Sequence, residues 1–333
     1  MKKYLLSLLV VLSSNLVFGQ FNSTNLKAEY GSENVYTYGN LRLYPVRAND
    51  VFLALHDNIG DYTILAEAVE KKKIVVTEVS NSGTVNTLFA ENLSSDSIYV
   101  MAGEIVKGGK QDRIIAQDFI LAPGEKVDVG AFCVEHGRWS AGAASNNLEE
   151  NTFDFENGIM LEYSNKAPVF EETAKVVSTD VREAAIVKKN QSEVWDEVAI
   201  VTSQNGATSG TGTYNQLENT TVFQDTLKKY LDHFNALFKN DKTIIGVVAV
   251  TGNEIIATDL FATNYLFINQ YDNLLHSYIT SAISSGSAIT ITGDAVQKYL
   301  DEFLSDESLQ KAILEMNGSQ FKYEGKILHC TRF

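Results

Sequence analysis

The residues best suited to chemistry fall in two short segments of the chain, 110–113 and 135–139. Arginine presents a planar fork of donors to a carboxylate or phosphate, whereas lysine acts as a compact charge. Glutamine adds amide hydrogen bonds, and a tryptophan ring adds a stacking surface. These residue types together predict a binding site for a small anionic ligand that carries a ring. The expected ligand-binding residues are Lys110, Gln111, Arg113, His136, Arg138 and Trp139.

A long β-hairpin over residues 107–140 would bring the two segments together. Its turn is predicted at 122–125, where Pro and Gly restrict the backbone. Folding the two arms back from this turn places Ile114 opposite Cys133. The strand face that carries these two residues is apolar and should pack on the core, with Asp118 as its one polar member.

Two glutamates near these segments are the candidate catalytic groups. Glu104 and Glu135 could form a carboxylate pair for acid–base catalysis, or orient a cation or a water molecule. His136 is the histidine inside the segments, and an imidazole can exchange a proton near neutral pH. The histidines show no spacing typical of a metal site, so no metal centre is predicted, and no cofactor is identified. The alternative is a structural ion-pair network without any ligand.

Several other residues have simpler structural explanations. The loop 206–213 is rich in Gly, Ser and Thr but lacks the lysine of a phosphate-binding loop, so we expect a flexible loop that could close over a ligand. Trp195 lies on an apolar helical stripe and is expected in the core, and Asp259 is expected to cap a helix. For Cys133 and Cys330 two alternatives remain open, a disulfide bond between them or two buried free thiols.

Residues 1–19 resemble a secretory signal, with Lys2 and Lys3 before an apolar run and small residues before Gln20. Export to the periplasm or the extracellular space is therefore expected, and no later run suggests membrane insertion. Without Lys2 and Lys3, the 27 basic residues fall to 25 against 42 acidic ones, a formal charge of about −17. This acidity argues against binding to nucleic acid polymers. The oligomeric state does not follow from the sequence.

The chain after the signal changes character near its middle. Residues 20–34 read as a polar leader, 35–140 as a β-rich region, 141–166 as an irregular connection, and 167–333 as a helical α+β region. Residues 35–333 could also form one integrated domain. Short turns between strands favour antiparallel pairing. The expected class is α+β, with sandwich-like sheets and a long hairpin packed against a helical half that has its own small β-hairpin.

The apolar periodicity places the individual elements. The expected strands are 40–46, 74–79, 84–91 and 97–101, with one helix at 62–72. The second half should contain helices at 179–202, 217–239, 265–283 and 293–304, a strand pair within 243–258, and a final hairpin around Glu324-Gly325.

Residues 103–113 and 133–139 resemble the signature of the family named for its association with ADP-ribosylglycohydrolase and rhodanese-phosphatase proteins. The pattern combines a Gly-Glu pair, a Lys-Gln-Asn-Arg run, a Pro-Gly turn and a Cys-Val-Glu-x-Gly-Arg-Trp end. Asp112 stands where this pattern prefers Asn, which adds a negative charge. Weaker likeness covers residues 191–195, 245–248 and 259–261.

The resemblance implies a link to ADP-ribose or other metabolites derived from NAD. The function expected from residues and resemblance together is the binding of a small anionic, nucleotide-like ligand at the open end of the hairpin, with its chemical processing left open. The alternative is a non-catalytic envelope or extracellular interaction module that uses loops such as 141–166 for recognition. Whether the protein is an enzyme is left open.

Overall fold

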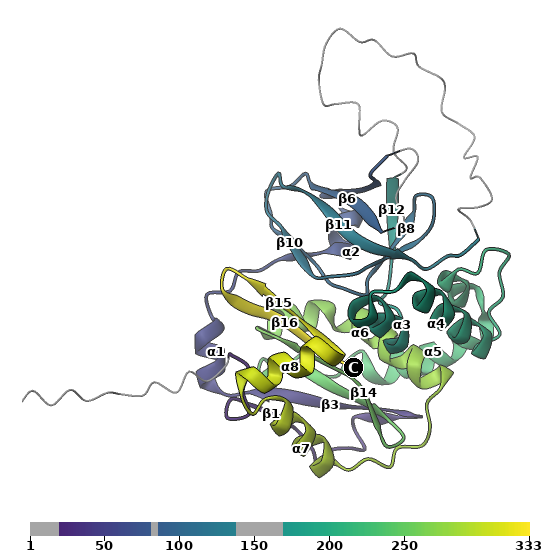
Figure 1. Cartoon of the computed structure of the whole chain (residues 1–333). Coiled ribbons are helices and arrows are strands. Elements are labelled where there is room, and N and C mark those ends of the chain that lie inside the picture. The colour runs from purple at the N-terminus through teal and green to yellow at the C-terminus, as the bar shows by residue number, and fades with distance from the viewer. Residues whose placement is uncertain (1–19, 81–85, 138–168) are drawn as a thin grey trace, which may run out of the picture.

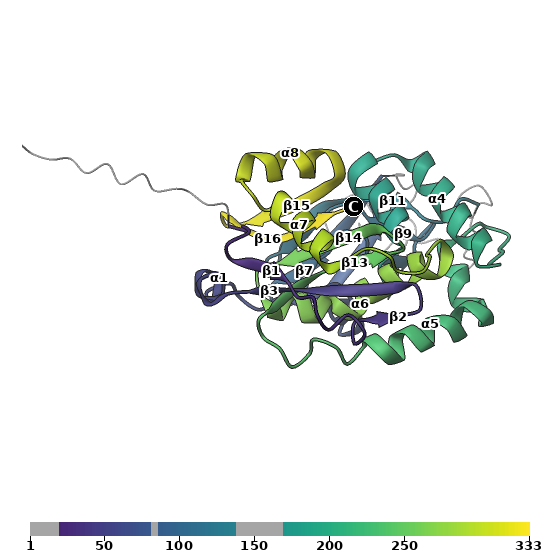
Figure 2. The same cartoon turned by 90° about the horizontal axis from the view of Figure 1, so that it is seen from below.

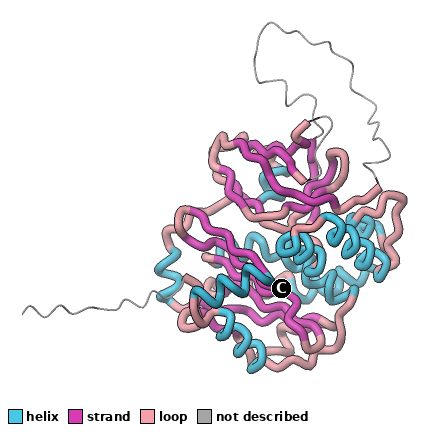
Figure 3. The backbone as a smooth tube through the Cα atoms, in the orientation of Figure 1, coloured by secondary structure: helices cyan, strands magenta, loops and turns pink. Residues whose placement is uncertain are grey.

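The computed structural model describes residues 20–80, 86–137 and 169–333 (Figure 1). The predicted signal at 1–19 and the connection at 141–166 lie outside the described residues. Within them, the strands pair mostly antiparallel and the longer helices belong to the second half of the chain. Figure 3 shows where helices and strands lie along the backbone. The predicted α+β class is therefore confirmed.

A seven-stranded sheet receives strands from both ends of the chain. Its order is β1-β3-β13-β14-β16-β15, with β2 paired to β3. The predicted hairpins of the second half are present as β13–β14 and β15–β16. The strands are β1 Leu26–Ala28, β2 Thr37–Tyr38, β3 Leu41–Ala48, β13 Ile244–Thr251, β14 Glu254–Phe261, β15 Gly318–Tyr323 and β16 Lys326–Arg332.

Helices cover both faces of this sheet (Figure 2). In β13, Val247 and Ala249 pack on the side of α6, whereas Val248 and Val250 pack on the side of α7 and α8. Because both faces are covered, every residue of β13 is buried. The α-helices are α1 Asp50–His56, α2 Leu65–Glu70, α3 Thr179–Glu183, α4 Gln191–Gln204, α5 Thr221–Phe234, α6 Asn264–Ser284, α7 Gly293–Phe303 and α8 Glu307–Asn317.

Sandwich-like sheets were expected in the β-rich region, but its strands close into a small barrel. The barrel also includes β12, which comes from the expected helical region 167–333. The barrel order is β11-β6-β5-β12-β8-β9, and a separate three-stranded sheet has the order β10-β7-β4. Closure leaves the barrel without an exposed edge strand. The strands are β4 Thr63–Ile64, β5 Ile74–Glu78, β6 Thr87–Asn92, β7 Ile98–Val100, β8 Ile105–Gly108, β9 Arg113–Ile115, β10 Phe119–Leu121, β11 Lys126–Cys133 and β12 Val169–Ala174.

The predicted long hairpin is only half present, and its register was wrong by one residue. Arg113 lies opposite Cys133, and Ile114 lies opposite Phe132. The first half of β11 pairs with β6, while β10 pairs with β7. The two arms therefore stay together only near the open end, which is the end that carries the candidate site.

Asp118 lies between β9 and β10, where the chain leaves β11. Its carboxylate accepts hydrogen bonds from the backbone N–H of Ala102 (2.7 Å) and from the hydroxyl of Tyr99 (2.8 Å). A buried carboxylate needs such partners. These bonds fix the segment before β10 beside β7, which explains why one polar residue interrupted the predicted apolar face.

The expected polar leader 20–34 is part of the large sheet. Phe21 and Leu26 are buried, and β1 pairs with β3. The prediction of a polar leader outside the fold was wrong because Phe21, Leu26 and Ala28 are buried in the core. Charged residues around them had masked this pattern.

The predicted helices differ from the structure mainly at their ends. The helix expected at 179–202 is interrupted by a π-helical segment, Ala184–Lys188, and by Lys189 in a left-handed conformation (φ 50°). The helix expected at 217–239 is α5, preceded by the 3-10 helix Tyr214–Asn219. The helices expected at 265–283 and 293–304 are confirmed as α6 and α7. The sequence reasoning missed α1 and α8.

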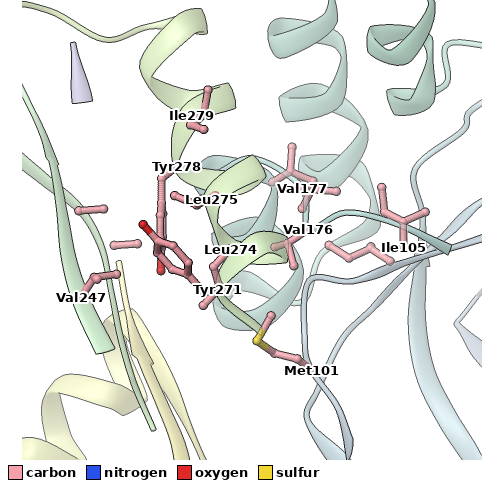
Figure 4. Close-up of a cluster of buried hydrophobic side chains, with 14 of the residues drawn as sticks. Met101, Ile105, Val176, Val177, Val247, Tyr271, Leu274, Leu275, Tyr278 and Ile279 are labelled. Carbon is pink, nitrogen blue, oxygen red and sulfur yellow. The ribbon is translucent and has the colours of Figure 1, made fainter. Parts of the chain in front are cut away.

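One hydrophobic cluster joins the barrel, the helices and the large sheet (Figure 4). It combines Met101 and Ile105 at the barrel with Leu274 on α6 and Val247 on β13, and Val176 lies between barrel and helix. Burial of these side chains is the main stabilising contribution that can couple the parts. The candidate site lies where the barrel and the helices meet.

Candidate functional site

The open ends of β9 and β11 are in contact, as the predicted fold-back requires. Gln111 donates its side-chain N–H to the backbone oxygen of His136 (3.2 Å). The backbone N–H of Asp112 donates to the Glu135 carboxylate (3.3 Å). The two segments therefore meet. The expected ligand-binding residues that lie outside the described part of the chain are Arg138 and Trp139.

Arg113 lies inside the protein, with 0% of its surface exposed. Its guanidinium forms an ion pair with the buried carboxylate of Glu78 (3.2 Å) and donates to Gln111 (3.2 Å) and to the Cys133 sulfur (2.7 Å). The backbone N–H of Lys110, which is half-buried, also donates to Glu78 (3.1 Å). A buried ion pair is stable only while both partners are present. This position supports a structural role for Arg113 in joining β9 to β5 and leaves no guanidinium surface for a ligand.

The two cysteines are both free thiols and both buried. Burial raises the pKa of Cys133 to about 11, so its sulfur is protonated at neutral pH. Burial also raises the pKa of Cys330. The alternative of two buried thiols is therefore the one found, and neither is activated as a nucleophile.

Asp112 anchors the segment that follows the loop 206–213. Its carboxylate accepts from the backbone N–H of Gly108 (3.0 Å), the side chain of Asn215 (2.6 Å) and the hydroxyl of Thr213 (3.4 Å). Each of these groups is a donor, and an ionised carboxylate is an acceptor only. Asp112, which stands where the family pattern prefers Asn, therefore has neighbours that donate hydrogen bonds to a carboxylate.

The two predicted catalytic carboxyl groups have separate partners. Glu104 accepts from the backbone N–H of Met101 (2.8 Å) and from Asn273 on α6 (3.1 Å), whereas Glu135 accepts from Asp112. Burial raises the pKa of Glu104 to about 8, so this carboxyl is mostly protonated at neutral pH. Within residues 20–80, 86–137 and 169–333, no group of three or more His, Cys, Asp and Glu residues could hold a metal ion.

A cavity of about 670 Å³ lies beside the end of β11. His136, which is exposed, stands edge-on to the ring of Trp195 on α4, with 4.4 Å between ring centroids. Trp195 is thus only half-buried and lines a cavity, whereas it was expected in the core. Hydroxyl groups form much of the remaining wall. The other lining residues are Ser192, Asp196, Ala199, Thr202, Ser203, Ala207, Thr208, Ser209, Gly212 and Thr213.

Gly137 holds the loop 206–213 against the end of β11. Its N–H donates to the backbone oxygen of Thr211 (2.7 Å). A Cβ atom at this position would lie 2.9 Å from the Thr211 Cα, closer than non-bonded atoms approach. The loop predicted to close over a ligand therefore forms one wall of the cavity. Gly137, which follows β11, makes the close approach of this loop possible.

A buried polar network was missed by the sequence reasoning. Arg182 pairs with Asp259 (2.6 Å), and His329 lies between Asp259 (3.1 Å) and Asp118 (2.6 Å). Although burial opposes a charged imidazole, the two carboxylates raise the pKa of His329 to about 9. Tyr278 also donates to Asp259 (2.5 Å). Asp259 lies within β14, and Thr263 caps the next helix, α6, so the expected capping role of Asp259 was wrong. The usable signals were Asp118 on an apolar face and Asp259 at the end of an apolar strand.

Comparison with known proteins places the whole of this architecture in one family. Residues 29–332 match the model described as the ARG and Rhodanese-Phosphatase-superfamily-associated Protein domain. Neither a curated protein nor a solved structure matches the chain. The matched range includes the barrel, every strand of the large sheet except β1, and the described residues of both segments that carried the resemblance. The chain therefore belongs to the ARG and Rhodanese-Phosphatase-superfamily-associated Protein family.

Proposed function

We propose that the protein binds a small, ring-bearing polar ligand in the cavity between His136, α4 and the loop 206–213. The observation that carries this proposal is the cavity itself, which lies beside the fold-back of the two family segments. Its volume of about 670 Å³ falls in the usual range of small-molecule sites. Gln111 and Arg113 are buried and support this site from behind, and the backbone N–H of Lys110 contacts Glu78, the ion-pair partner of Arg113.

The lining favours a ligand with a ring and several hydroxyl or phosphate oxygens. Trp195 and His136 offer ring surfaces, and the Ser and Thr hydroxyls can donate to phosphate oxygens or exchange hydrogen bonds with a sugar. Asp196 can accept hydrogen bonds from ligand hydroxyls but disfavours a high negative charge nearby. A nucleotide-like ligand whose sugar faces Asp196 satisfies both conditions. The family name motivates ADP-ribose as the first probe.

Thermal-shift measurements with ADP-ribose, NAD and ribose 5-phosphate test the proposal. We expect at least one of these probes to raise the melting temperature of the wild-type protein, because a ligand that binds only the native state stabilises it. Ala199→Trp should abolish the shift, since it places an indole in the cavity from an exposed position on α4.

The matched control is Ile200→Trp, one residue further along α4. Ile200 is 48% exposed and does not line the cavity, so this variant should keep the full ligand shift. A shift that survives in both variants would place the ligand elsewhere. The absence of any shift with the wild-type protein would remove support for a nucleotide-like ligand.

The second candidate function is a non-catalytic interaction module. It is favoured by the buried ion pair of Arg113 with Glu78 and by the three donors around Asp112, because these charges are engaged within the protein. On this account the two family segments serve only to brace the barrel against the helices. The Ala199→Trp experiment separates the two candidates, since a module of this kind requires no ligand in the cavity.

We also propose that the protein is exported. The support is the sequence of residues 1–19, with two lysines before an apolar run. None of the helices in the described residues has the length and apolar character of a membrane span. Mass spectrometry of the protein from the expressing cell should give a chain that begins at Gln20, and a full-length chain retained in the cytosol would contradict export.

A further inference from the structure

A second cavity, of about 320 Å³, lies between the barrel and the helices α5 and α6. It has an apolar part and a polar part. Phe223 and Leu227, one turn apart on α5, contribute to the apolar part together with Leu217. Lys175 and His276 contribute to the polar part. This combination of an apolar wall with a few converging polar groups is typical of small-molecule sites.

Lys175 forms no ion pair with a carboxylate among the described residues. Its ammonium donates to the side-chain oxygen of Asn273 (3.1 Å). Asn273 in turn donates to Glu104. Because burial raises the pKa of Glu104 to about 8, that carboxyl is mostly neutral at pH 7. Glu218, the carboxylate in the lining, is held by Lys107 at 2.9 Å.

His276 adds a neutral hydrogen-bonding group beside this charge. Burial, and then the charge of Lys175, lower the pKa of His276 to about 4. Its imidazole is therefore uncharged at pH 7 and can donate one N–H to an acceptor. His276 and Asn273 lie three residues apart on α6, so the imidazole and the amide that contacts Lys175 are on one helical face.

We propose that this second cavity binds a small carboxylic acid with an apolar body, its carboxylate placed between Lys175 and His276. The apolar body lies against Phe223, Leu227 and Leu217. A carboxylate accepts a hydrogen bond from each of these two polar groups and forms an ion pair with the Lys175 ammonium. Removal of the apolar surface of such a ligand from water supplies the rest of the affinity.

Calorimetric titration of the full chain with phenylacetate tests this site, with phenylacetamide as a neutral probe of the same shape. We expect phenylacetate to bind at least about tenfold more tightly than phenylacetamide, because a charge-assisted hydrogen bond is stronger than a neutral one. Lys175→Met should remove most of this preference. Lys175 is exposed, so the variant should keep the wild-type melting temperature.

The control variant is Lys229→Met, because Lys229 is exposed on α5 and outside the cavity lining. It should bind phenylacetate like the wild-type protein, and so should Ala199→Trp, which blocks only the cavity beside His136. Equal affinity for the acid and the amide would overturn the proposal, as would unchanged phenylacetate binding in Lys175→Met or no binding by the wild-type protein.

Discussion

The residues around His329 show how buried charges depend on one another. The side chains of Arg182 and Asp259 are both 0% exposed. Arg182 lies on α3 and Asp259 on β14, so their ion pair joins the helix to the large sheet. The imidazole of His329 then links Asp259 to Asp118 near the small sheet. The sequence indicates this arrangement only through Asp118 and Asp259, each of which lies within an apolar stretch. Their partners could not be predicted, because Arg182 and His329 are far away in sequence and share no pattern with them.

Removal of one partner from this network should be costly. Arg182→Met leaves Asp259 buried with less compensating charge, so we expect a loss of roughly 3–5 kcal/mol of unfolding free energy. Chemical denaturation measures this loss. The double variant Arg182→Met/Asp259→Asn should lose less than the single variant, because no full charge is then stranded. A loss below about 1 kcal/mol for Arg182→Met would contradict a stabilising network.

The same residues predict how stability depends on pH. The folded-state pKa of His329, about 9, lies above its ordinary value of 6.5, so its contribution is complete below pH 6.5 and is lost as the pH rises through 9. The pKa of Glu104, raised from 4.5 to about 8, acts in the same direction. The melting temperature should therefore fall between pH 6.5 and pH 9.

A matched pair of variants isolates the part due to Glu104. Glu104→Gln should flatten the fall in melting temperature between pH 6.5 and pH 8, since the amide has no proton to lose in this range. Glu254→Gln, at an exposed strand position, should keep the wild-type profile. A melting temperature that rises over this range would show that Glu104 and His329 do not have the expected folded-state charges.

At the level of elements, local sequence patterns predicted most strands and helices. The predictions failed where strand pairing depends on partners that are distant in sequence. The turn at 122–125 formed as predicted, with Gly124 at φ +73°. Beyond this turn the two arms of the predicted hairpin separate, because β10 pairs with β7 and the first half of β11 pairs with β6. No local feature distinguishes one β-rich partner from another. The two segments that carry the candidate residues still meet despite this error, because β9 and β11 remain paired at the open end.

The π-helical segment before α4 gives a prediction at this scale. Lys189 ends it with φ 50° and ψ 41°, a conformation that costs a non-glycine residue about 1 kcal/mol. Lys189→Gly should therefore be neutral or stabilising by up to about 1 kcal/mol, whereas Lys188→Gly, in helical backbone, should destabilise by about 1 kcal/mol. Equilibrium denaturation of the two variants gives both values. Equal destabilisation would argue against the left-handed turn.

At the scale of the molecule, the chain closes on itself. β3 from the first part of the chain pairs with β13 from the second, and the barrel is inserted between them in sequence. Composition could predict a β-rich region followed by a helical one, but not that strands from both regions share a sheet. The role of residues 20–34 was predicted wrongly for the same reason, because Phe21 and Leu26 belong to a core cluster that combines Phe52 with residues more than 200 positions further along the chain.

This closure predicts that the N-terminal residues stabilise the whole fold. Phe21 is 2% exposed and packs on Phe52 with 5.4 Å between ring centroids. Phe21→Ala should cost roughly 3–5 kcal/mol of unfolding free energy, because it removes a large buried side chain. Val35→Ala, at a position 52% exposed, should change stability by less than about 0.5 kcal/mol. Similar small effects in both variants would show that the segment before β3 does not belong to the core.

The most direct test of the proposed ligand site uses the fluorescence of Trp195. The chain contains two tryptophans, so Trp139→Phe leaves Trp195 as the sole indole reporter on the wall of the cavity. Titration of this variant with ADP-ribose should give a saturable change in emission, with a midpoint that matches the concentration dependence of the thermal shift. A thermal shift without any change in Trp195 emission, or no response of either kind, would contradict binding beside His136.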